Sequence, residues 1–326
     1  MSIKRSVSFY SYQEAYYKGD CTLEDMIRFT GETLKAEGVE ILAEQTPVGR
    51  FPDPTDEDVD RWHSWMEKYN TKPSCLDSFI DWYLYKNRTL TLKEQVKQME
   101  RDIRLARRLG FPVIRVLCPV RKEVVEASIP IAEYCGVKMG LEVHSPMKLS
   151  ARWITEYMDM VVKSGSKYAG IIPDFGIFMM RPAKKQLDKA RAGGARDEVL
   201  SQIISWCESH IPFAEMVANA NALGVNDAEM SVVQSFARNV FTDPEELRAF
   251  APYIFHCHGK FYDMDENCRE TSIDYENPIR VLREIGYEGY ISSEFEGQRL
   301  YGVDEVCDEF EQVRRHQAML KRLVEN

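Results

Sequence analysis

The stretch YIFHCHGKFYD, from Tyr253 to Asp263, has the pattern of a short buried strand that carries polar side chains on one face. Because side chains two residues apart on a strand point to the same side, His256, His258 and Lys260 share that side. Basic groups on an apolar strand are costly to bury unless a carboxylate, a metal or another ligand meets them. This stretch therefore predicts the centre of a functional site, whose remaining members come from elsewhere in the chain.

Three acidic residues lie late in, or just after, apolar runs of their own. Glu142 lies in GLEVHS, Asp174 in GIIPDFG and Glu294 in YISSEFEG. Asp174 follows Glu142, and Glu294 follows His258, by about one strand–helix unit. Two glutamates, one aspartate and one histidine make a hard, mostly oxygen site. We therefore predict one divalent cation bound by these four residues, with Mn²⁺ preferred and Mg²⁺, Co²⁺ or Zn²⁺ as alternatives.

Short apolar runs alternate with longer amphipathic segments along the whole chain. Eight runs have the pattern of strands, at residues 5–12, 39–45, 73–79, 113–119, 138–145, 168–176, 253–263 and 290–296. Alternation of strands and helices predicts a parallel α/β sheet, and eight units predict a closed (β/α)₈ TIM barrel. An open doubly wound sheet is the alternative, but no strand is followed by GxGxxG or GxxxxGK[ST]. The polar residues above fall at strand ends, which is the catalytic face of a barrel.

The regular alternation breaks between the sixth and seventh predicted strands, which lie about two units apart. Residues 184–196 are highly charged and contain a Gly-Gly pair, and helical patterns follow at 197–223 and 228–238. We therefore predict a single TIM-barrel domain over residues 1–326, with a helical insertion on its rim at about 182–251.

Glu142 and His144 are two residues apart on the fifth predicted strand, so both face the same mouth of the barrel. Imidazole titrates near neutral pH, and a nearby cation disfavours its protonated form, so His144 is predicted to be a general base beside the metal. A hydrogen-bonded structural histidine is the alternative. A metal with an adjacent base fits proton abstraction next to a carbonyl, in which Glu142 and Glu294 would also take part.

Three further side chains are predicted to contact a substrate. Lys260 suits a substrate oxygen or carboxylate, although a lysine there can also extend to solvent. His256 lies either one layer deeper in the barrel or against the substrate. Trp82, in the aromatic segment DWYLYKN, is predicted to form a wall of the pocket, with core packing as the alternative.

Composition excludes several classes of partner. The net charge of −10 argues against nucleic acid and anionic membranes. No apolar run approaches the ~20 residues of a membrane span, and the N-terminus MSIKRSVSFYSYQ lacks the pattern of a signal peptide. The eight cysteines are scattered without CxxC pairs, as in reduced cytosolic proteins. We therefore predict a cytoplasmic protein.

At these residues the chain resembles the xylose-isomerase-like TIM barrels, which include sugar isomerases, ketose 3-epimerases, inosose dehydratases and relatives of endonuclease IV. The resemblance implies a Glu, Asp, His, Glu metal set, which falls on Glu142, Asp174, His258 and Glu294. HCHGKF offers both the H-x-H and the H-x-K context of the family's histidine. Ile177 departs from the pattern, because ketose epimerases and the endonucleases carry a histidine there. The endonucleases' extra zinc ligands are also missing, which argues against DNA repair.

Within that family, SFYSYQEAYYKGDCTLED, GLEVHSP and HCHGKFYDMD are similar to the large (α) subunit of bacterial C-glycoside deglycosidases. This resemblance implies cleavage of the C–C bond between a 3-oxo sugar and an aromatic aglycone, a metal that is commonly manganese, and a small β subunit in an oligomer. It also implies an elimination in which His144 removes the C2 proton. One alternative is a keto-sugar epimerase or isomerase, which Asp174 and Glu294 would serve equally well. The other is a non-catalytic barrel subunit with a structural metal.

Overall fold

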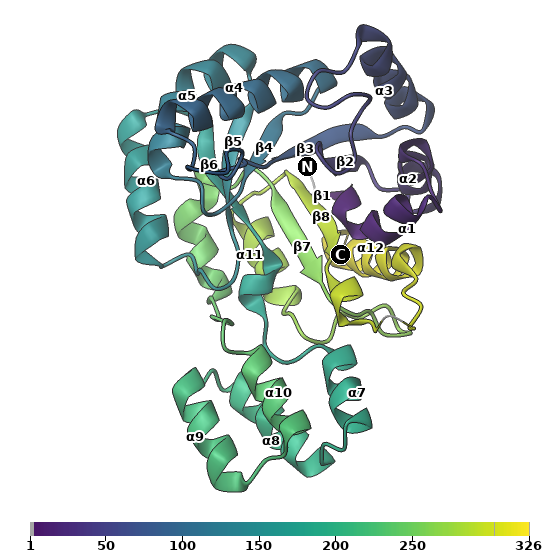
Figure 1. The fold of residues 1–326 in the computed structure, drawn as a ribbon, viewed down its shortest axis with the longest axis vertical. Coiled ribbons are helices and arrows are strands. Elements are labelled where there is room, and N and C mark those ends of the chain that lie inside the picture. Colours follow the sequence, from purple (N-terminus) through teal and green to yellow (C-terminus); the bar gives the residue numbers. More distant parts are fainter. Residues whose placement is uncertain (1–2, 303, 326) are drawn as a thin grey trace.

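Eight parallel strands form one sheet in a computed structural model that describes residues 3–302 and 304–325 (Figure 1). Their order is β6–β5–β4–β3–β2–β1–β8–β7. Two bridges, Ile171 with Ile254 and Asp174 with His258, join the ends of that order and nearly close the barrel. The predicted TIM-barrel fold is confirmed. The strands are β1 Lys4–Ser8, β2 Gly38–Leu42, β3 Lys72–Ser78, β4 Val113–Val116, β5 Lys138–Val143, β6 Ala169–Pro173, β7 Cys257–Phe261 and β8 Tyr290–Phe295.

Helices surround the sheet, and several of them begin at side-chain caps. The side chain of Thr91 accepts the backbone N–H of Glu94, whose carboxylate accepts the N–H of Thr91, and this capping box starts α4. Gly110 ends that helix with a left-handed φ of 82°. The outer helices are α1 Gln13–Lys18, α2 Leu23–Arg28, α3 Asp56–Lys68, α4 Leu92–Leu109, α5 Lys122–Cys135, α6 Arg152–Ser164, α11 Glu276–Glu284 and α12 Glu309–Glu325. Among the described residues, no helix is both long and apolar enough to cross a membrane.

Short helical turns occupy several of the connections after strands. They are η1 Phe9–Tyr12, η2 Phe29–Thr33, η3 Phe175–Phe178, η4 Pro244–Tyr253 and η5 Gly297–Leu300. η1, η3 and η5 follow the carboxyl ends of β1, β6 and β8, so they turn the chain sharply at the mouth of the barrel. β2, β5 and β6 are buried along nearly their whole length, which is why their sequences are apolar apart from a few charged positions.

Four helices in the connection from β6 to β7 project from the barrel as a separate group (Figure 1). They are α7 Lys184–Ala192, α8 Asp197–Glu208, α9 Phe213–Leu223 and α10 Asp227–Ser235. Their apolar faces share a hydrophobic cluster distinct from the barrel core, built from residues such as Leu200, Ile203, Met216 and Val233. η4 instead contacts α11 and β6, and its Leu247 belongs to the barrel core. The helices that share this second cluster therefore end before the predicted boundary at residue 251.

Candidate metal centre and active site

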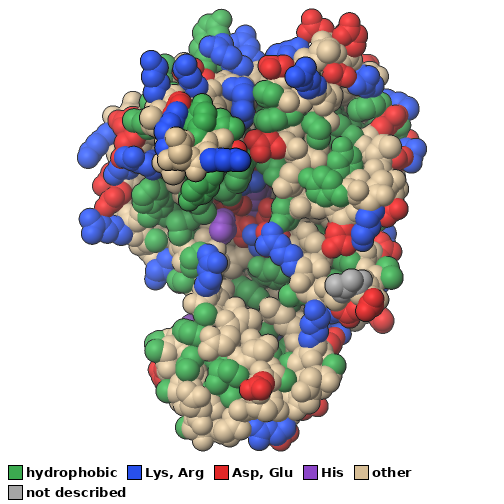
Figure 2. Space-filling model, viewed as in Figure 1, with side chains coloured by type: hydrophobic (Ala, Val, Ile, Leu, Met, Phe, Trp, Pro, Cys, Tyr) green, Lys and Arg blue, Asp and Glu red, His purple; other side chains and the backbone are tan. Residues whose placement is uncertain are grey.

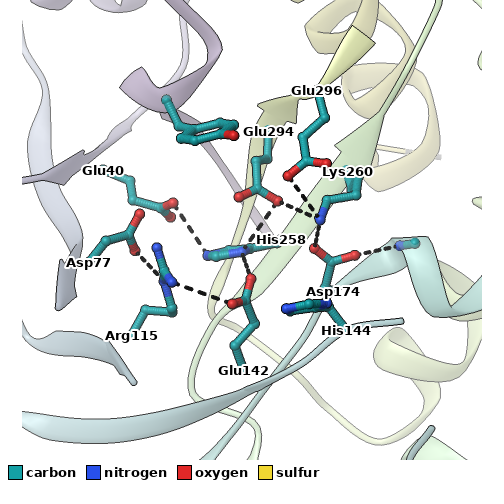
Figure 3. A network of polar contacts seen from close by, with 12 residues as sticks. Glu40, Asp77, Arg115, Glu142, His144, Asp174, His258, Lys260, Glu294 and Glu296 are labelled. Atoms are coloured by element: carbon teal, nitrogen blue, oxygen red, sulfur yellow. Dashed lines mark hydrogen bonds and ion pairs between the residues drawn. The ribbon is translucent and has the colours of Figure 1, made fainter. Parts of the chain in front are cut away.

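Four residues from consecutive strands converge at the carboxyl end of the barrel (Figure 3). Glu142, Asp174, His258 and Glu294 lie on or just after β5 to β8, and each offers a ligand atom within 4.8 Å of the others. All four side chains are buried. His258 Nδ1 is 2.9 Å from Glu142 Oε1 and 3.5 Å from Glu294 Oε2. The structure thus brings together the four residues named from the sequence as metal ligands.

The buried oxygens of this cluster fit a bound cation. Asp174 Oδ2 and Glu294 Oε2 are buried and have no partner with hydrogen-bond geometry among the described residues, although both lie within ion-pair distance of Lys260; Asp174 Oδ1 accepts the N–H of Gly176 at 2.6 Å. Lys260 Nζ lies 2.8 Å from Asp174 Oδ2 and 3.6 Å from Glu294 Oε2, so one lysine faces several carboxylates. Buried carboxylates are costly unless a cation meets them. Three carboxylates and an imidazole suit a divalent cation such as Mn²⁺.

The electrostatics of the cluster keep its glutamates charged. Burial opposes ionisation of Glu142, but the Arg115 guanidinium and His258 hold the pKa of Glu142 at about 2. Burial likewise opposes ionisation of Glu294, yet Lys260 and His258 hold its pKa well below the usual value. For Asp174, burial outweighs Lys260 and raises the pKa to about 7. The protein's own cations therefore compensate the two glutamates better than the aspartate.

Strands β2 to β4 supply a second arc of charged residues behind the cluster (Figure 3). Arg115 of β4 points its Nη1 at Glu142 Oε2, 3.4 Å away, and its Nε at Asp77 Oδ1, 3.2 Å away. Glu40 of β2 faces His258 from the opposite side of the ring. Sequence reasoning missed these three residues. A signal was present for two of them, since Glu40 and Arg115 are charged residues inside the apolar strands VEIL and VIRV, whereas Asp77 lies in the mostly polar strand KPSCLDS.

His144 lies at the cavity beside the cluster. Its Nδ1 lies 2.6 Å from the carbonyl oxygen of Ser145, and its Nε2 lies 3.2 Å from Cys118 Sγ. The hydrogen bond with Cys118 and the charges of Glu142 and Asp174 raise the pKa of His144 to about 9 against the effect of burial. We expected a neutral His144 ring, but the protein groups around it favour the protonated imidazolium. A neutral ring therefore needs a further positive charge nearby.

A cavity of about 470 Å³ opens above the cluster. Figure 2 shows this face hollowed, with acidic side chains and a histidine within the hollow and apolar side chains around it. The floor includes Arg115, Glu142, His144, Asp174, Lys260 and Glu294, and the walls include Tyr10, Phe79, Met179, Arg238, Tyr262 and Arg299. Arg238 follows α10, so the projecting helices contribute to the wall. Ser145 Oγ donates to the carbonyl oxygen of Arg238 at 2.7 Å, which ties that wall to the loop after β5.

The three predicted substrate contacts occupy different places. Lys260 lies in the cavity floor. His256 does not line the cavity as the described residues define it, and its Nε2 is 2.6 Å from Glu40 Oε2. The Trp82 indole N–H donates to Gln95 Oε1 at 3.2 Å, while Phe79, edge-on to Trp82, lines the cavity. His256 and Trp82 therefore have protein partners in place of a position in the cavity wall.

Comparison with known proteins places the chain in a family. Residues 32–323 match the family model of the xylose isomerase-like TIM barrel. A 3'-dehydrocarminate deglycosidase alpha subunit from a Microbacterium species is 30% identical, over 97% of this chain and 94% of its own. A C-glycoside deglycosidase alpha subunit from Arthrobacter globiformis is 27% identical, over 99% of this chain and 93% of its own. The solved structure of an L-ribulose 3-epimerase shares the fold, with a TM-score of 0.58 at 12% identity over 99% of this chain and 95% of its own. The chain therefore belongs to the xylose isomerase-like TIM barrels, and it is an enzyme that acts on sugars.

Proposed function

We propose that the protein is the α subunit of a divalent-metal-dependent C-glycoside deglycosidase, which cleaves the C–C bond of a 3-oxo-C-glycoside by elimination. The observation that carries the proposal is the convergence of the four candidate ligands with His144 and Lys260 at the floor of one cavity. The name that relatives of 27–30% identity bear supports the choice of substrate.

Glu142, Asp174, His258 and Glu294 would hold the cation, for which we propose Mn²⁺, with Mg²⁺, Co²⁺ and Zn²⁺ as alternatives. When bound, the cation would supply Lewis-acid stabilisation of negative charge that develops on a substrate oxygen. The Lys260 ammonium lies 3.4 Å from Glu296 Oε1 in addition to its contacts with Asp174 and Glu294. These carboxylates fix the ammonium at the cavity floor, where it can donate to a sugar hydroxyl or carbonyl oxygen.

We assign His144 the removal of the sugar C2 proton, which the neighbouring 3-oxo group acidifies. With its Nδ1 directed at the Ser145 carbonyl, the ring would present Nε2 as the nitrogen that accepts this proton. That role requires a neutral ring, which a cation bound beside it would favour by offsetting the charges of Glu142 and Asp174, and it requires Nε2 to exchange its contact with Cys118 for the substrate. The electron pair of the C2–H bond forms the C1–C2 double bond. The C1–aryl bond breaks, and its pair leaves with the aryl carbon, which takes up a proton. The products are an unsaturated 3-oxo sugar and the free aglycone.

The walls of the cavity divide it into a sugar side and an aglycone side. The metal cluster and Lys260 form the floor, while Phe79, Met179 and Arg238 stand on the wall. Met179 follows β6 and Arg238 follows α10, so both belong to the long connection that carries the helices α7 to α10. We place the aromatic aglycone against this wall, because aromatic and apolar side chains bind flat rings and rim loops set specificity in barrels.

A second subunit belongs to the proposal. The relatives are named alpha subunits, which supports assembly with a smaller β partner in a hetero-oligomer. The scattered free cysteines support a reducing, cytoplasmic location.

Incubation of the Mn²⁺-loaded protein, alone and with its co-expressed partner, with 3-oxo-C-glycosides tests the proposal. Chromatography should detect released aglycone, and in deuterated water the recovered substrate should carry deuterium at C2. Ketohexoses serve as the comparison substrates. Epimerised ketohexose without aglycone release from any C-glycoside would replace the proposal with a keto-sugar epimerase. Metal binding without α-proton exchange on either class would indicate a non-catalytic barrel.

A further inference from the structure

Glu40 of β2 lies between two histidines in the barrel interior. Its carboxylate is fully buried, with Oε2 2.6 Å from His256 Nε2. Its Oε1 is 3.3 Å from His258 Nε2 (Figure 3). Glu40 does not line the cavity as the described residues define it, so it is placed to act through its neighbours and not on a substrate.

The two ring nitrogens of His258 face different partners. Nδ1 points at Glu142 and Glu294, and Nε2 points at Glu40. A nitrogen that binds a metal carries no proton, so a neutral His258 bound through Nδ1 carries its proton on Nε2. That N–H is buried and needs an acceptor. Metal-binding histidines commonly donate this second N–H to a carboxylate, which fixes the ring orientation.

The atoms for this hydrogen bond already face one another. His258 Nε2 and Glu40 Oε1 are both buried and both without a hydrogen bond from the described residues. Their separation of 3.3 Å is slightly longer than the roughly 2.7–3.2 Å of a formed N–H···O bond. Formation of the bond therefore requires the ring or the carboxylate to turn so that the N–H points at Oε1. The other oxygen of Glu40 is held by His256, which explains why that histidine turns away from the cavity.

A second metal site is the competing explanation, because Glu40 also clusters with Cys75 and His256 and, separately, with Asp77 and His258. Both sets offer only three ligands. His256 Nε2 already lies within hydrogen-bond distance of Glu40, and the Arg115 guanidinium already faces Asp77. Each set offers one ligand fewer than the cluster of Glu142, Asp174, His258 and Glu294, so we favour a hydrogen-bonding role for Glu40.

We propose that Glu40 is a positioning residue of the metal centre: it accepts the Nε2–H of His258 and holds the Nδ1 side of the ring toward Glu142, Asp174 and Glu294. His256 in turn holds Glu40 in place. This inference rests on the metal centre of the proposed function, and it extends the site to a strand on the far side of the barrel that supplies no ligand.

Three substitutions at one position separate the possible roles. Glu40→Met keeps the length of the side chain and removes the acceptor. Glu40→Gln restores an acceptor without the charge. Glu40→Asp keeps the charge but draws the carboxylate back by one methylene. The affinity for Mn²⁺ is measured for the chelator-stripped full-length chain by competition with a fluorescent chelator, and the number of ions per chain is counted by elemental analysis. Glu126→Gln, at an exposed glutamate on α5, is the matched control.

Glu40→Met should weaken Mn²⁺ binding by about 10–100-fold, the range for the loss of such a partner, while Glu40→Gln recovers most of the affinity. If Glu40→Gln bound Mn²⁺ as weakly as Glu40→Met, while Glu40→Asp bound it as tightly as the unsubstituted protein, only the charge of Glu40 would matter. That result would overturn the inference. Equal affinity in all variants, or a second ion lost on Cys75→Ala, would overturn it as well. Unsubstituted protein that binds no Mn²⁺ would instead refute the proposed metal centre itself. Urea unfolding of each metal-free variant identifies any that fails to fold, and the Gln variant, which keeps the shape of Glu40, then decides.

Discussion

The substitution Asp174→Asn tests the metal centre with little disturbance of the fold. Oδ1 of the side chain caps η3 by accepting the Gly176 N–H at 2.6 Å, and an asparagine oxygen preserves that bond. The other oxygen, which faces Lys260 and the ligand cluster, becomes an amide NH₂ that cannot bind a cation. Burial raises the pKa of Asp174 to about 7, so the carboxyl is only partly ionised near neutral pH, and loss of its contact with Lys260 costs the metal-free protein less than loss of a fully charged partner would.

The expected effect follows from linkage between binding and folding. A cation that binds only the folded chain stabilises it by RT ln(1 + [M]/Kd), or about 4 kcal/mol at ~1,000 times Kd. For 326 residues, an unfolding entropy of about 2.1 cal/mol/K per residue gives about 0.7 kcal/mol/K, so 4 kcal/mol raises the melting temperature by about 6 °C. A hundredfold loss of affinity in Asp174→Asn would leave about 1.4 kcal/mol, or about 2 °C.

Thermal unfolding of chelator-treated protein, followed with and without added Mn²⁺, measures both quantities. The substituted protein should melt near the unsubstituted protein when metal-free and should lose most of the shift caused by Mn²⁺. Glu126→Gln, at an exposed glutamate of α5, should keep the full shift. An undiminished shift in Asp174→Asn would remove Asp174 from the ligand set, and a large loss of metal-free stability would show that its role is structural.

Three further predictions concern residues at and away from the centre. His144→Ala should keep the Mn²⁺-dependent melting shift but lose turnover on the order of 10²–10⁴-fold; exchange of the substrate α-proton at the original rate would exclude His144 as the base. Arg238→Ala should raise KM for C-glycosides with little change in kcat, whereas Arg104→Ala, exposed on α4, should not; equal KM values would place the aglycone elsewhere. Burial lowers the pKa of His316 to about 3, below the ~6.5 of an unfolded chain, so the unfolded state binds the extra proton as pH falls between these values. From this group alone, the free energy of unfolding should therefore drop by about 1.4 kcal/mol per pH unit below ~6. His316→Gln should lack that part of the pH dependence in urea unfolding at pH 7, 6 and 5. An identical pH dependence in both proteins would contradict the assignment.

The positions of the strands could be predicted from the sequence, because buried parallel strands are continuous apolar runs separated by amphipathic helices. Their ends could not. The first apolar run extends to Tyr12, but β1 stops at Ser8 because residues 9–12 turn as η1 over the barrel mouth. β4 likewise stops at Val116, three residues before its apolar run ends. At the carboxyl ends of the strands, the chain leaves the hydrogen-bond pattern of the sheet and turns into the loops that form the site. Apolar residues in these turns are buried without being part of a strand.

A residue of the site could be predicted where the sequence of its own strand shows an unusual charged position. Glu142 and His258 stand out as charged or basic residues in apolar strands. Glu40 has the same signal, but its meaning depends on a partner across the barrel interior. Only the curvature of the sheet brings β2 and β7, which β1 and β8 separate, within contact of each other. The aromatic segment near Trp82 presents the opposite difficulty. Side chains in a loop do not alternate with a fixed period, so the sequence does not show which of them face the cavity. The aromatic composition predicted an aromatic wall, but it did not show that Phe79 lines it.

The charges in the barrel interior explain why the site needs both arcs of residues. Five buried carboxylates come together in the interior: Glu40, Asp77, Glu142, Asp174 and Glu294. Among the residues that the structure describes, Arg115 and Lys260 are the permanently charged cations that contact them. Arg115 sits in the arc of β2 to β4 and compensates Asp77 and Glu142, while Lys260 sits among Asp174 and Glu294. A divalent cation at the four-residue cluster would supply the charge that these two side chains leave uncompensated. Arg115 keeps Glu142 ionised, and Glu40 faces the ring of His258, so the second arc would orient the proposed ligands on β5 to β8 before a cation binds.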